Sequence, residues 1–219
     1  MKHVLEADGI QLAFGLRRIL NDVYLRCQTG AITGLLGRNG QGKTCLMNTV
    51  FGTLENADKS IRFDGRRIVH PFKRPELIRY LPQFNFIPAG ISLQRVFVDF
   101  NVNFETFKHD FPNSNLRITQ KVRDLSGGQK RLLEIYTILK SPCQFVMLDE
   151  PFTHLAPRDV ERIKEIIISE KENKGILLSD HLYQHIIEIS EAIYVLVNGK
   201  TWRINNNADI EDLGYAKRL

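Results

Sequence analysis

Apolar and polar residues alternate over most of the first third of the chain, a pattern that predicts β-strands. A glycine-rich loop interrupts the alternation, and an apolar helical segment follows it. The predicted elements are strands at residues 4–14, 19–27 and 31–36, a helix at 44–50, and a hairpin-like pair at 60–69. Asp8 and Gly9 predict a turn within the first strand, and Asp64 and Gly65 predict the turn of the pair.

The pattern changes after residue 83, where aromatic and aliphatic residues gather around Pro88 and Gly90. The remaining predicted elements are helices at 130–139, 158–169 and 183–190, and strands at 145–148, 175–178 and 192–197, the last of which we expect to be the final strand. Strands that alternate with helices predict a parallel α/β core. We therefore expect one domain, with 1–83 and 141–219 as its core and 84–140 as a mostly helical insertion.

Composition fits one soluble globular domain. The chain has 219 residues, of which 43% are hydrophobic and 25% charged. No apolar run approaches the roughly 18 to 20 residues that cross a bilayer, and the N-terminus does not resemble a signal peptide. The net charge of +5 raises the question of nucleic acid or an anionic membrane surface. Its positive charges are scattered among carboxylates, so a mixed-charge surface is favoured and nucleic acid is not expected.

The cysteines and a histidine pair offer weaker candidate sites. Cys27, Cys45 and Cys143 show no Cys-x-x-Cys spacing, so neither a disulfide framework nor a zinc site is indicated. Cys45 lies just inside the helix after the glycine-rich loop, where the helix dipole could lower its pKa, although a small buried residue is favoured. His181 and His185 have the spacing of a metal pair but no third ligand nearby, and metal binding is disfavoured.

The glycine-rich loop has the full pattern of a phosphate-binding loop. It reads Gly37, Arg38, Asn39, Gly40, Gln41, Gly42, Lys43 and Thr44, between a predicted strand and a predicted helix. The glycines let backbone N–H groups converge on a phosphate at a helix N-terminus. Lys43 is placed to meet the β- and γ-phosphate oxygens, and the Thr44 hydroxyl to ligate Mg²⁺. This loop predicts nucleotide binding.

Two carboxylates end a buried strand. Four apolar residues at 145–148 precede Asp149 and Glu150, and ligands of open α/β sheets collect at that end of the strands. Asp149 is predicted to hold the metal through its water shell, and Glu150 to accept a proton from an attacking water. An acidic pair of this kind is often only a strand end, but its combination with a phosphate loop favours the catalytic interpretation.

A third segment, residues 125–129, precedes the helix predicted at 130–139. Its Ser126 hydroxyl and the N–H groups of Gly127 and Gly128 can meet phosphate oxygens at a second helix N-terminus. The alternative is that Ser126 simply caps the helix. In this order and spacing the three segments resemble the ABC-type nucleotide-binding domain, over nearly the whole chain. The resemblance implies a phosphate-loop NTPase fold: a parallel-sheet α/β core, an N-terminal antiparallel β subdomain and a helical insertion.

The resemblance also implies roles for particular residues in hydrolysing ATP to ADP and phosphate. Gln83 matches the glutamine that contacts the metal and the water, with a plain turn residue as the alternative. His181 matches the histidine that contacts the γ-phosphate, or else caps a helix, and Phe14 matches the ring that stacks on adenine, or else is a core aromatic. The full set is Glu150, His181, Gln83 and Lys43 for catalysis; Thr44, Gln83 and Asp149 for Mg²⁺; and Phe14, residues 37–44 and Cys45 for ATP.

Family geometry implies that two chains pack head to tail. Each ATP then lies between one chain's phosphate loop and the partner's Ser126, Gly127, Gly128 and Gln129, so a second ATPase subunit, most simply an identical chain, is expected. One position departs from the pattern. Ala156 stands where the family usually has an aspartate that crosses the dimer interface, which predicts slow or weakly cooperative turnover.

Three uses of the ATP compete. The favoured one is to power a membrane transporter through an integral membrane permease subunit, which would hold the chain at the inner face of the cell membrane. The apolar residues Phe84, Phe86, Ile87, Val96 and Phe97 would line a cleft for that subunit or be core of the insertion. The compact chain resembles the subunits of bacterial exporters and lipid-moving systems. The alternatives are a soluble ATPase acting on ribosomes or DNA, and a weakly active regulatory module.

Overall fold

Two β-sheets and six α-helices make up the computed structural model, which describes residues 2–55, 57–181 and 183–204. The antiparallel sheet has the strand order β2-β1-β4-β5. Its strands are β1 (Val4–Phe14), β2 (Arg17–Gln28), β4 (Ala57–Phe63) and β5 (Arg66–Arg67). The last part of the predicted core, residues 205–219, lies outside the described part of the chain.

The second sheet has the order β10-β9-β3-β8-β7-β6. Its strands are β3 (Ile32–Leu36), β6 (Ile78–Leu81), β7 (Phe145–Asp149), β8 (Gly175–Ser179), β9 (Ala192–Val197) and β10 (Lys200–Ile204). All neighbours pair in parallel except β9 and β10, which form an antiparallel hairpin. This confirms the predicted parallel α/β core and the antiparallel layer before it.

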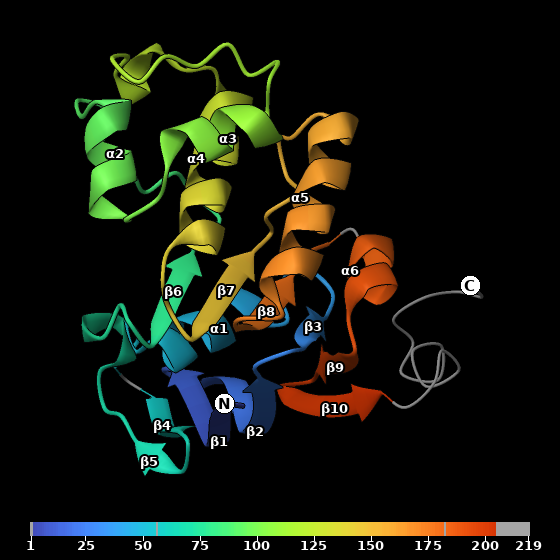
Figure 1. The fold of residues 1–219 in the computed structure, drawn as a ribbon. Coiled ribbons are helices and arrows are strands. Elements are labelled where there is room, and N and C mark those ends of the chain that lie inside the picture. The colour runs from blue at the N-terminus through green and yellow to red at the C-terminus, as the bar shows by residue number, and fades with distance from the viewer. Residues whose placement is uncertain (1, 56, 182, 205–219) are drawn as a thin grey trace.

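The helices are α1 (Lys43–Phe51), α2 (Leu93–Asp99), α3 (Phe104–Asp110), α4 (Gly127–Lys140), α5 (Pro157–Glu170) and α6 (Tyr183–Ile189), with 3₁₀ turns η1 (Pro71–Lys73) and η2 (Val122–Asp124). Four of the helices, α1, α4, α5 and α6, pack against the sheets, and α2 and α3 lie apart from them (Figure 1). The α2 and α3 helices lie at the end of the molecule away from the antiparallel sheet (Figure 1). No helix among the described residues is long and apolar enough to span a membrane.

Helix α1 packs between the two sheets. Its buried side chains Leu46, Met47 and Val50 share one hydrophobic cluster with the inward faces of both sheets. Side chains alternate along each strand, so neighbouring strand residues enter different cores. Thus Met147 on β7 faces α1, whereas Leu148 faces the opposite side. The cluster fixes the phosphate loop, because the loop joins a core strand to a core helix.

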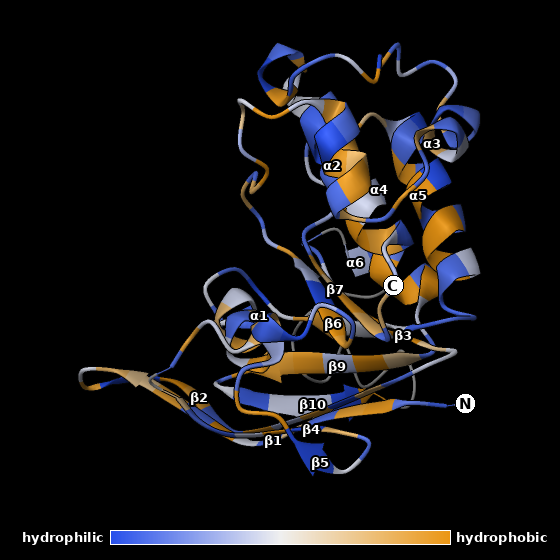
Figure 2. Ribbon diagram, turned by 60° about the vertical axis from the view of Figure 1, so that its left-hand side comes forward, coloured by the Kyte–Doolittle hydropathy of each residue, from blue (hydrophilic) through white to orange (hydrophobic). Residues whose placement is uncertain are grey.

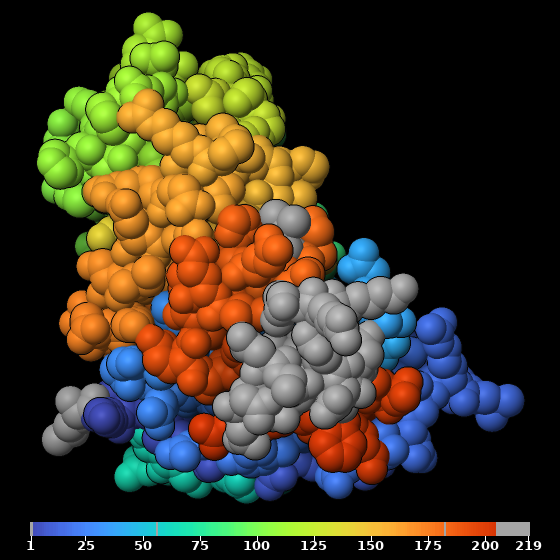
Figure 3. Space-filling model, turned by 90° about the vertical axis from the view of Figure 1, so that its right-hand side faces the viewer, coloured from blue at the N-terminus to red at the C-terminus, as the bar shows by residue number. Residues whose placement is uncertain are grey.

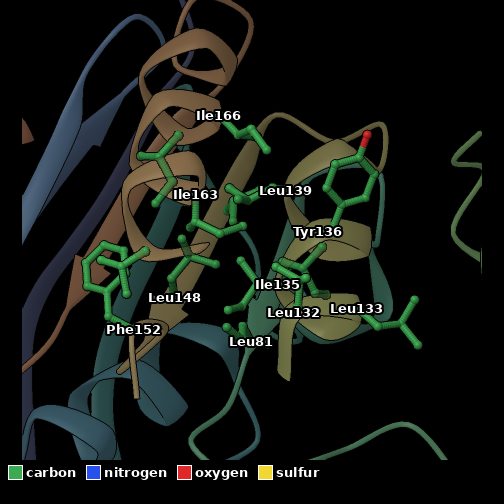
Figure 4. Packing of buried hydrophobic residues seen from close by; sticks show 14 of the residues in the cluster. Leu81, Leu132, Leu133, Ile135, Tyr136, Leu139, Leu148, Phe152, Ile163 and Ile166 are labelled. Atoms are coloured by element: carbon green, nitrogen blue, oxygen red, sulfur yellow. The ribbon is translucent and has the colours of Figure 1, made fainter. Parts of the chain in front are cut away.

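The other face of the parallel sheet is covered by α4, α5 and α6. Figure 4 shows side chains of α4 and α5 meeting Leu81 and Leu148 of the sheet. Tyr136, at the outer end of this core, is completely buried and packs edge-on against the Phe107 ring of α3. One hydrophobic cluster therefore joins the predicted insertion to the core. On the surface, α5 lies beside α6 (Figure 3).

Several predicted elements were wrong in detail. Asp8 and Gly9 form no chain reversal, since β1 runs through them with a shift of register against β2 between Ala7 and Ile10. The strand at 192–197 is not the last, because β10 follows it. Figure 2 shows why β10 was missed: it is mostly hydrophilic, whereas β9 is hydrophobic along most of its length. Strand β6, only four residues long and containing Arg79, was also missed.

Candidate functional site

The phosphate loop leaves strand β3 at Gly37 and enters helix α1 at Lys43. A Cβ atom on Gly37 would lie 2.9 Å from the carbonyl oxygen of Leu196, so this position admits only glycine. Gly40 and Gly42 have φ angles of 81° and 101°, which glycine adopts without strain. Gly42 caps α1 without a side-chain hydrogen bond, and the first turn holds no acidic residue. The positive end of the helix dipole therefore faces the loop without a neutralising side chain, as an anion site requires.

Lys43 lies inside this loop and is only 5% exposed. Its ammonium donates to the carbonyl oxygen of Gly37 at 2.6 Å, so the side chain folds back across the loop. Burial lowers its pKa, while the carboxylates of Glu150, Asp149 and Asp180 oppose that shift. A buried cation beside the glycine-rich backbone of this loop is suited to phosphate oxygens.

The two carboxylates at the end of β7 differ in environment. Asp149 is completely buried, and burial raises its pKa, although hydrogen bonds from Thr44 and Tyr80 act against the rise. Glu150 has a φ of 50°, and its N–H donates to the carbonyl oxygen of Ser179 at 2.7 Å. A left-handed residue directly after a strand is strained and is typical of functional sites. This turn directs Glu150 away from the strand.

Gln83 brings these groups together. Its side-chain amide donates to the Thr44 hydroxyl at 2.9 Å, to Glu150 Oε1 at 3.0 Å and to Asp149 Oδ1 at 3.4 Å. One amide thus reaches α1 and both carboxylates at the end of β7. The Thr44 hydroxyl and the Asp149 carboxylate fit Mg²⁺, because it prefers oxygen ligands and a cation would stabilise the buried charge of Asp149. Gln83 presents its amide nitrogen to both groups, so its amide oxygen would join a metal only after the amide turns. The described residues contain no cluster of three or more His, Cys, Asp or Glu able to hold a metal alone.

His181 lies beside Glu150. Its Nδ1 atom is 3.7 Å from Glu150 Oε2 and 3.3 Å from Asp180 Oδ1, and the side chain is 43% exposed. Asp180, which is completely buried, accepts the backbone N–H of Phe152 at 3.2 Å. His185 does not join this group: its ring packs on Phe152 with centroids 5.3 Å apart. His181 therefore lies with the carboxylates of Glu150 and Asp180, and it does not form a metal-binding pair with His185.

The segment before α4 is capped within itself. Ser126 Oγ accepts the N–H of Gln129 at 3.2 Å, and Gln129 Oε1 accepts the N–H of Ser126 at 2.9 Å. This reciprocal capping box starts α4 at Gly127, three residues before the predicted start, because it satisfies the first N–H groups of the helix. The Gln129 amide also donates to the carbonyl of Ser114. Around Gly127 there is open space, whereas a Cβ on Gly128 would be 3.1 Å from the carbonyl oxygen of His154.

The remaining predicted ATP-binding residues lie at the edges of the loop. Gln41 Oε1 accepts the N–H of Asn198 at 3.0 Å, which ties the loop to the β9–β10 turn, while Arg38 and Asn39 are exposed. Phe14 is at the end of β1 and 49% exposed, so it is not a core aromatic. The possible lowering of the Cys45 pKa is wrong, because burial, and next the Asp149 charge, raise that pKa.

Arg131 was missed from the sequence, although it joins the pieces of the site. It is 2% exposed on α4, and its guanidinium donates to the carbonyl oxygens of Pro82 at 2.7 Å, Asp149 at 2.9 Å and Glu150 at 2.8 Å. One turn further, Glu134 Oε1 accepts the N–H groups of Phe86 and Ile87. The helix that follows Ser126 therefore holds the backbone on both sides of Gln83. The sequence signal for this role was the presence of two charged residues, Arg131 and Glu134, three residues apart on an otherwise apolar helix face.

Comparisons with known proteins agree with this geometry. The family model for ABC transporters matches residues 20–153. The chain is 28% identical to the branched-chain amino acid transport ATP-binding protein BraG of Pseudomonas aeruginosa, over 90% of each chain. It is 30% identical to the lipopolysaccharide export ATP-binding protein LptB of Haemophilus influenzae, over 90% of this chain and 88% of that one. A solved ATP-binding subunit of an ABC transporter, 20% identical, superposes with a TM-score of 0.79 over 97% of this chain and 94% of that chain.

The fold and the phosphate loop define a nucleotide-binding ATPase of the phosphate-loop class. The match of the family model over more than half of the chain makes the assignment more specific: this chain belongs to the ABC transporter family. It is the ATP-binding component of that family, an ATPase whose activity is coupled to transport. The resemblance and the fold class expected from the sequence are both confirmed.

Proposed function

We propose that the chain binds ATP with Mg²⁺ at the cluster formed by residues 37–44, Gln83, Asp149 and Glu150. The N–H groups at the start of α1 and the Lys43 ammonium bind the phosphates, and Phe14 stacks on the adenine. Thr44 and Asp149, with Gln83 through its amide oxygen once the amide turns, would hold the metal, which would supply charge neutralisation on the phosphate oxygens. The observation that carries this proposal is the single Gln83 amide in contact with Thr44 and both carboxylates.

Hydrolysis follows from the placement of Glu150 and His181. Glu150 accepts a proton from a water molecule as the water oxygen bonds to the γ-phosphorus and the bond to the β-bridging oxygen breaks, giving ADP and phosphate. His181, whose Nδ1 lies 3.7 Å from Glu150 Oε2, orients that carboxylate and meets the γ-phosphate. Lys43 neutralises charge that develops toward the leaving oxygen.

A second copy of the chain completes the site. Ser126, Gly127, Gly128 and Gln129 of one chain would meet the ATP held by the phosphate loop of the other, with Gly127 open to an approaching ligand. Two helix N-termini then face one set of phosphates, which stabilises the dimer only while ATP is bound. The division into a core of 1–83 and 141–219 and an insertion of 84–140 is part of this proposal, because the insertion carries those residues.

The chain would act on an integral membrane permease subunit, which would place it at the inner face of the cell membrane. An apolar groove of about 410 Å³ supports this. Most of its lining is apolar or aromatic, with the polar residues Asn48, Thr53 and Arg79 also present. The large apolar and aromatic side chains include those of Phe51, Phe72, Tyr80, Phe84, Phe86, Phe100 and Ile138. Phe84 is 70% exposed in this groove, whereas Ile87, Val96 and Phe97 belong to the core. The apolar residues at the start of the insertion are therefore divided between the groove and the core. Exposed aromatic rings beside Gln83 suit a short helix of a membrane partner.

Co-purification tests this function. The full chain, tagged and isolated from membranes of its own cells in mild detergent, should recover a protein with several membrane spans. Phe84→Asp should lose that protein and retain ATP binding, while Ile168→Asp, which places the same charge at a residue 42% exposed on α5, should keep it. Recovery of ribosomes or DNA in place of a membrane protein, or full recovery with Phe84→Asp, would overturn the proposal.

A further inference from the structure

Next to the groove, one exposed segment carries an unusual density of positive charge. Residues 66–74, called here the basic strip, contain Arg66, Arg67, Lys73 and Arg74, together with His70 and no carboxylate. All five of these side chains are exposed. The strip runs from β5 through the η1 turn, along the edge of the antiparallel sheet (Figure 1). Figure 2 shows β5 as hydrophilic.

Two of the four Arg and Lys charges of the basic strip have a carboxylate neighbour. Arg74 pairs with Glu76, and Asp64 lies near Arg66. Among the described contacts, Arg67 reaches only the backbone oxygen of Lys59, at 3.5 Å, and the Lys73 ammonium lies 5.6 Å above the Phe72 ring. The neighbouring strand β4 is different, because its Arg62 bonds to Asp8 and Glu6 across the sheet. The basic strip therefore carries a local excess of positive charge.

The basic strip also exposes apolar side chains between its charges. Val69 is 63% exposed and Phe72 is 37% exposed. The Phe72 ring packs against the Phe51 ring of α1, with the two ring centroids 6.4 Å apart, and the preceding Pro71 is buried. Phe72 also forms part of the groove wall, so the basic strip is continuous with the surface proposed to receive the membrane subunit.

We propose that the basic strip binds the anionic phospholipid surface of the membrane directly, beside the permease. Arginine and lysine attract phosphate headgroups, and the exposed Val69 and Phe72 side chains bury in the interfacial layer. A nucleic acid would use the charges but would leave Val69 without a partner, which favours lipid. The position of the strip beside the membrane rests on the proposed function, because the strip adjoins the groove that is proposed to receive the permease subunit. The lipid contact itself needs neither ATP nor permease.

Vesicle flotation of the purified full chain tests this inference. Binding is expected to vesicles of phosphatidylcholine with phosphatidylglycerol, to be absent with phosphatidylcholine alone, and to weaken as salt is raised. Replacing Arg66, Arg67 and Lys73 by Gln should lower the affinity about 100-fold, since each charge near the surface contributes about five-fold. The matched control replaces Arg26, Lys200 and Arg203, exposed cations of β2 and β10, by Gln and loses the same net charge.

The control variant should retain most of the binding, and both variants should retain ATP binding and an unchanged melting temperature. Val69→Ser should cause a smaller loss that is insensitive to salt. Equal loss in the two triple variants would overturn the proposal, because net charge alone would then explain binding. Stronger capture of RNA than of anionic vesicles, or absence of vesicle binding, would also overturn it. None of these three results would affect the proposed partnership with a membrane subunit, which is tested separately by recovery of a membrane partner.

Discussion

The phosphate loop and the Ser126 segment are both glycine-rich starts of helices, yet they are built differently. Gly42 caps α1 without a side chain, and the loop encloses Lys43 beside two carboxylates. Ser126 and Gln129, in contrast, satisfy each other's N–H groups and leave their glycines facing solvent or backbone. The first arrangement suits the proposed half of a reaction site, because its charges are already in place. The second is a stable surface that, in the proposed function, acts only when a phosphate is brought to it.

Arg131 links the two regions within one chain. It belongs to the helix that Ser126 starts, and its guanidinium holds the carbonyl oxygens that precede Gln83 and that belong to Asp149 and Glu150. A shift of α4 would therefore move the backbone around Gln83. The difference between the regions separates two proposed roles. The cluster at the phosphate loop would perform the chemistry, and the buried Arg131 would connect it to the surface proposed to meet a partner.

The largest effect is expected at Lys43. Lys43→Ala should lower ATP hydrolysis at least about 100-fold, because the loop loses its buried cation and the phosphates lose a charged donor. Phosphate release measured at saturating ATP checks this. Lys108→Ala, which removes an exposed cation of α3, should leave the rate unchanged. A Lys43 variant that hydrolyses ATP at the original rate would remove the phosphate loop from the mechanism.

Removal of Arg131 should cost stability as well as activity. Arg131→Met should lower the free energy of unfolding by about 3 kcal/mol, since three buried carbonyl oxygens lose their donor. Arg123→Met, at a side chain 64% exposed, should change it by less than about 0.5 kcal/mol. Chemical denaturation of both variants makes the measurement. Equal stability of the two variants would mean that Arg131 does not connect the regions.

A substitution in the Ser126 segment should affect stability and leave ATP binding by the single chain unchanged, unlike a substitution in the phosphate loop. Ser126→Ala should cost about 1 kcal/mol of stability through the lost cap and should leave ATP affinity of the isolated chain unchanged. Titration calorimetry at a dilution that keeps the chain monomeric checks this. If the variant bound ATP much more weakly as a monomer, Ser126 would belong to the chain's own site.

Ala156 offers the smallest and most specific change. It caps α5 without a side-chain oxygen. Ala156→Asp should raise stability by about 1 kcal/mol by capping the helix, and should raise turnover and its cooperativity by restoring a polar group in the interfacial loop. Ala156→Val, which has no capping oxygen, should do neither. A wild-type Hill coefficient and rate that Ala156→Asp does not improve would refute the expectation of weak coupling.

Local patterns predicted where most residues of the cluster lie in the fold, while their roles remain predictions. The phosphate loop and the acidic pair are contiguous in the sequence, and each follows a buried strand, so spacing alone placed them. A local pattern could have marked Arg131 as a charge on an apolar helix face, but it could not identify its partners, because these are backbone oxygens of residues far away in the chain. The rise in the Cys45 pKa was missed for a similar reason, since the burial and the Asp149 charge that cause it come from the fold. Exposed or very short strands, β6 and β10, lacked the alternation on which strand prediction depends.

The central claim is that one chain holds half of each ATP site and that a second chain completes it. The Glu150→Gln variant, which keeps the shape of the site and removes the base, tests this most directly when its mass is measured by light scattering with and without Mg-ATP. The mass of a monomer is expected without nucleotide and that of a dimer with Mg-ATP, and the added replacement Ser126→Ala should reduce the dimer. A monomer under both conditions would contradict it.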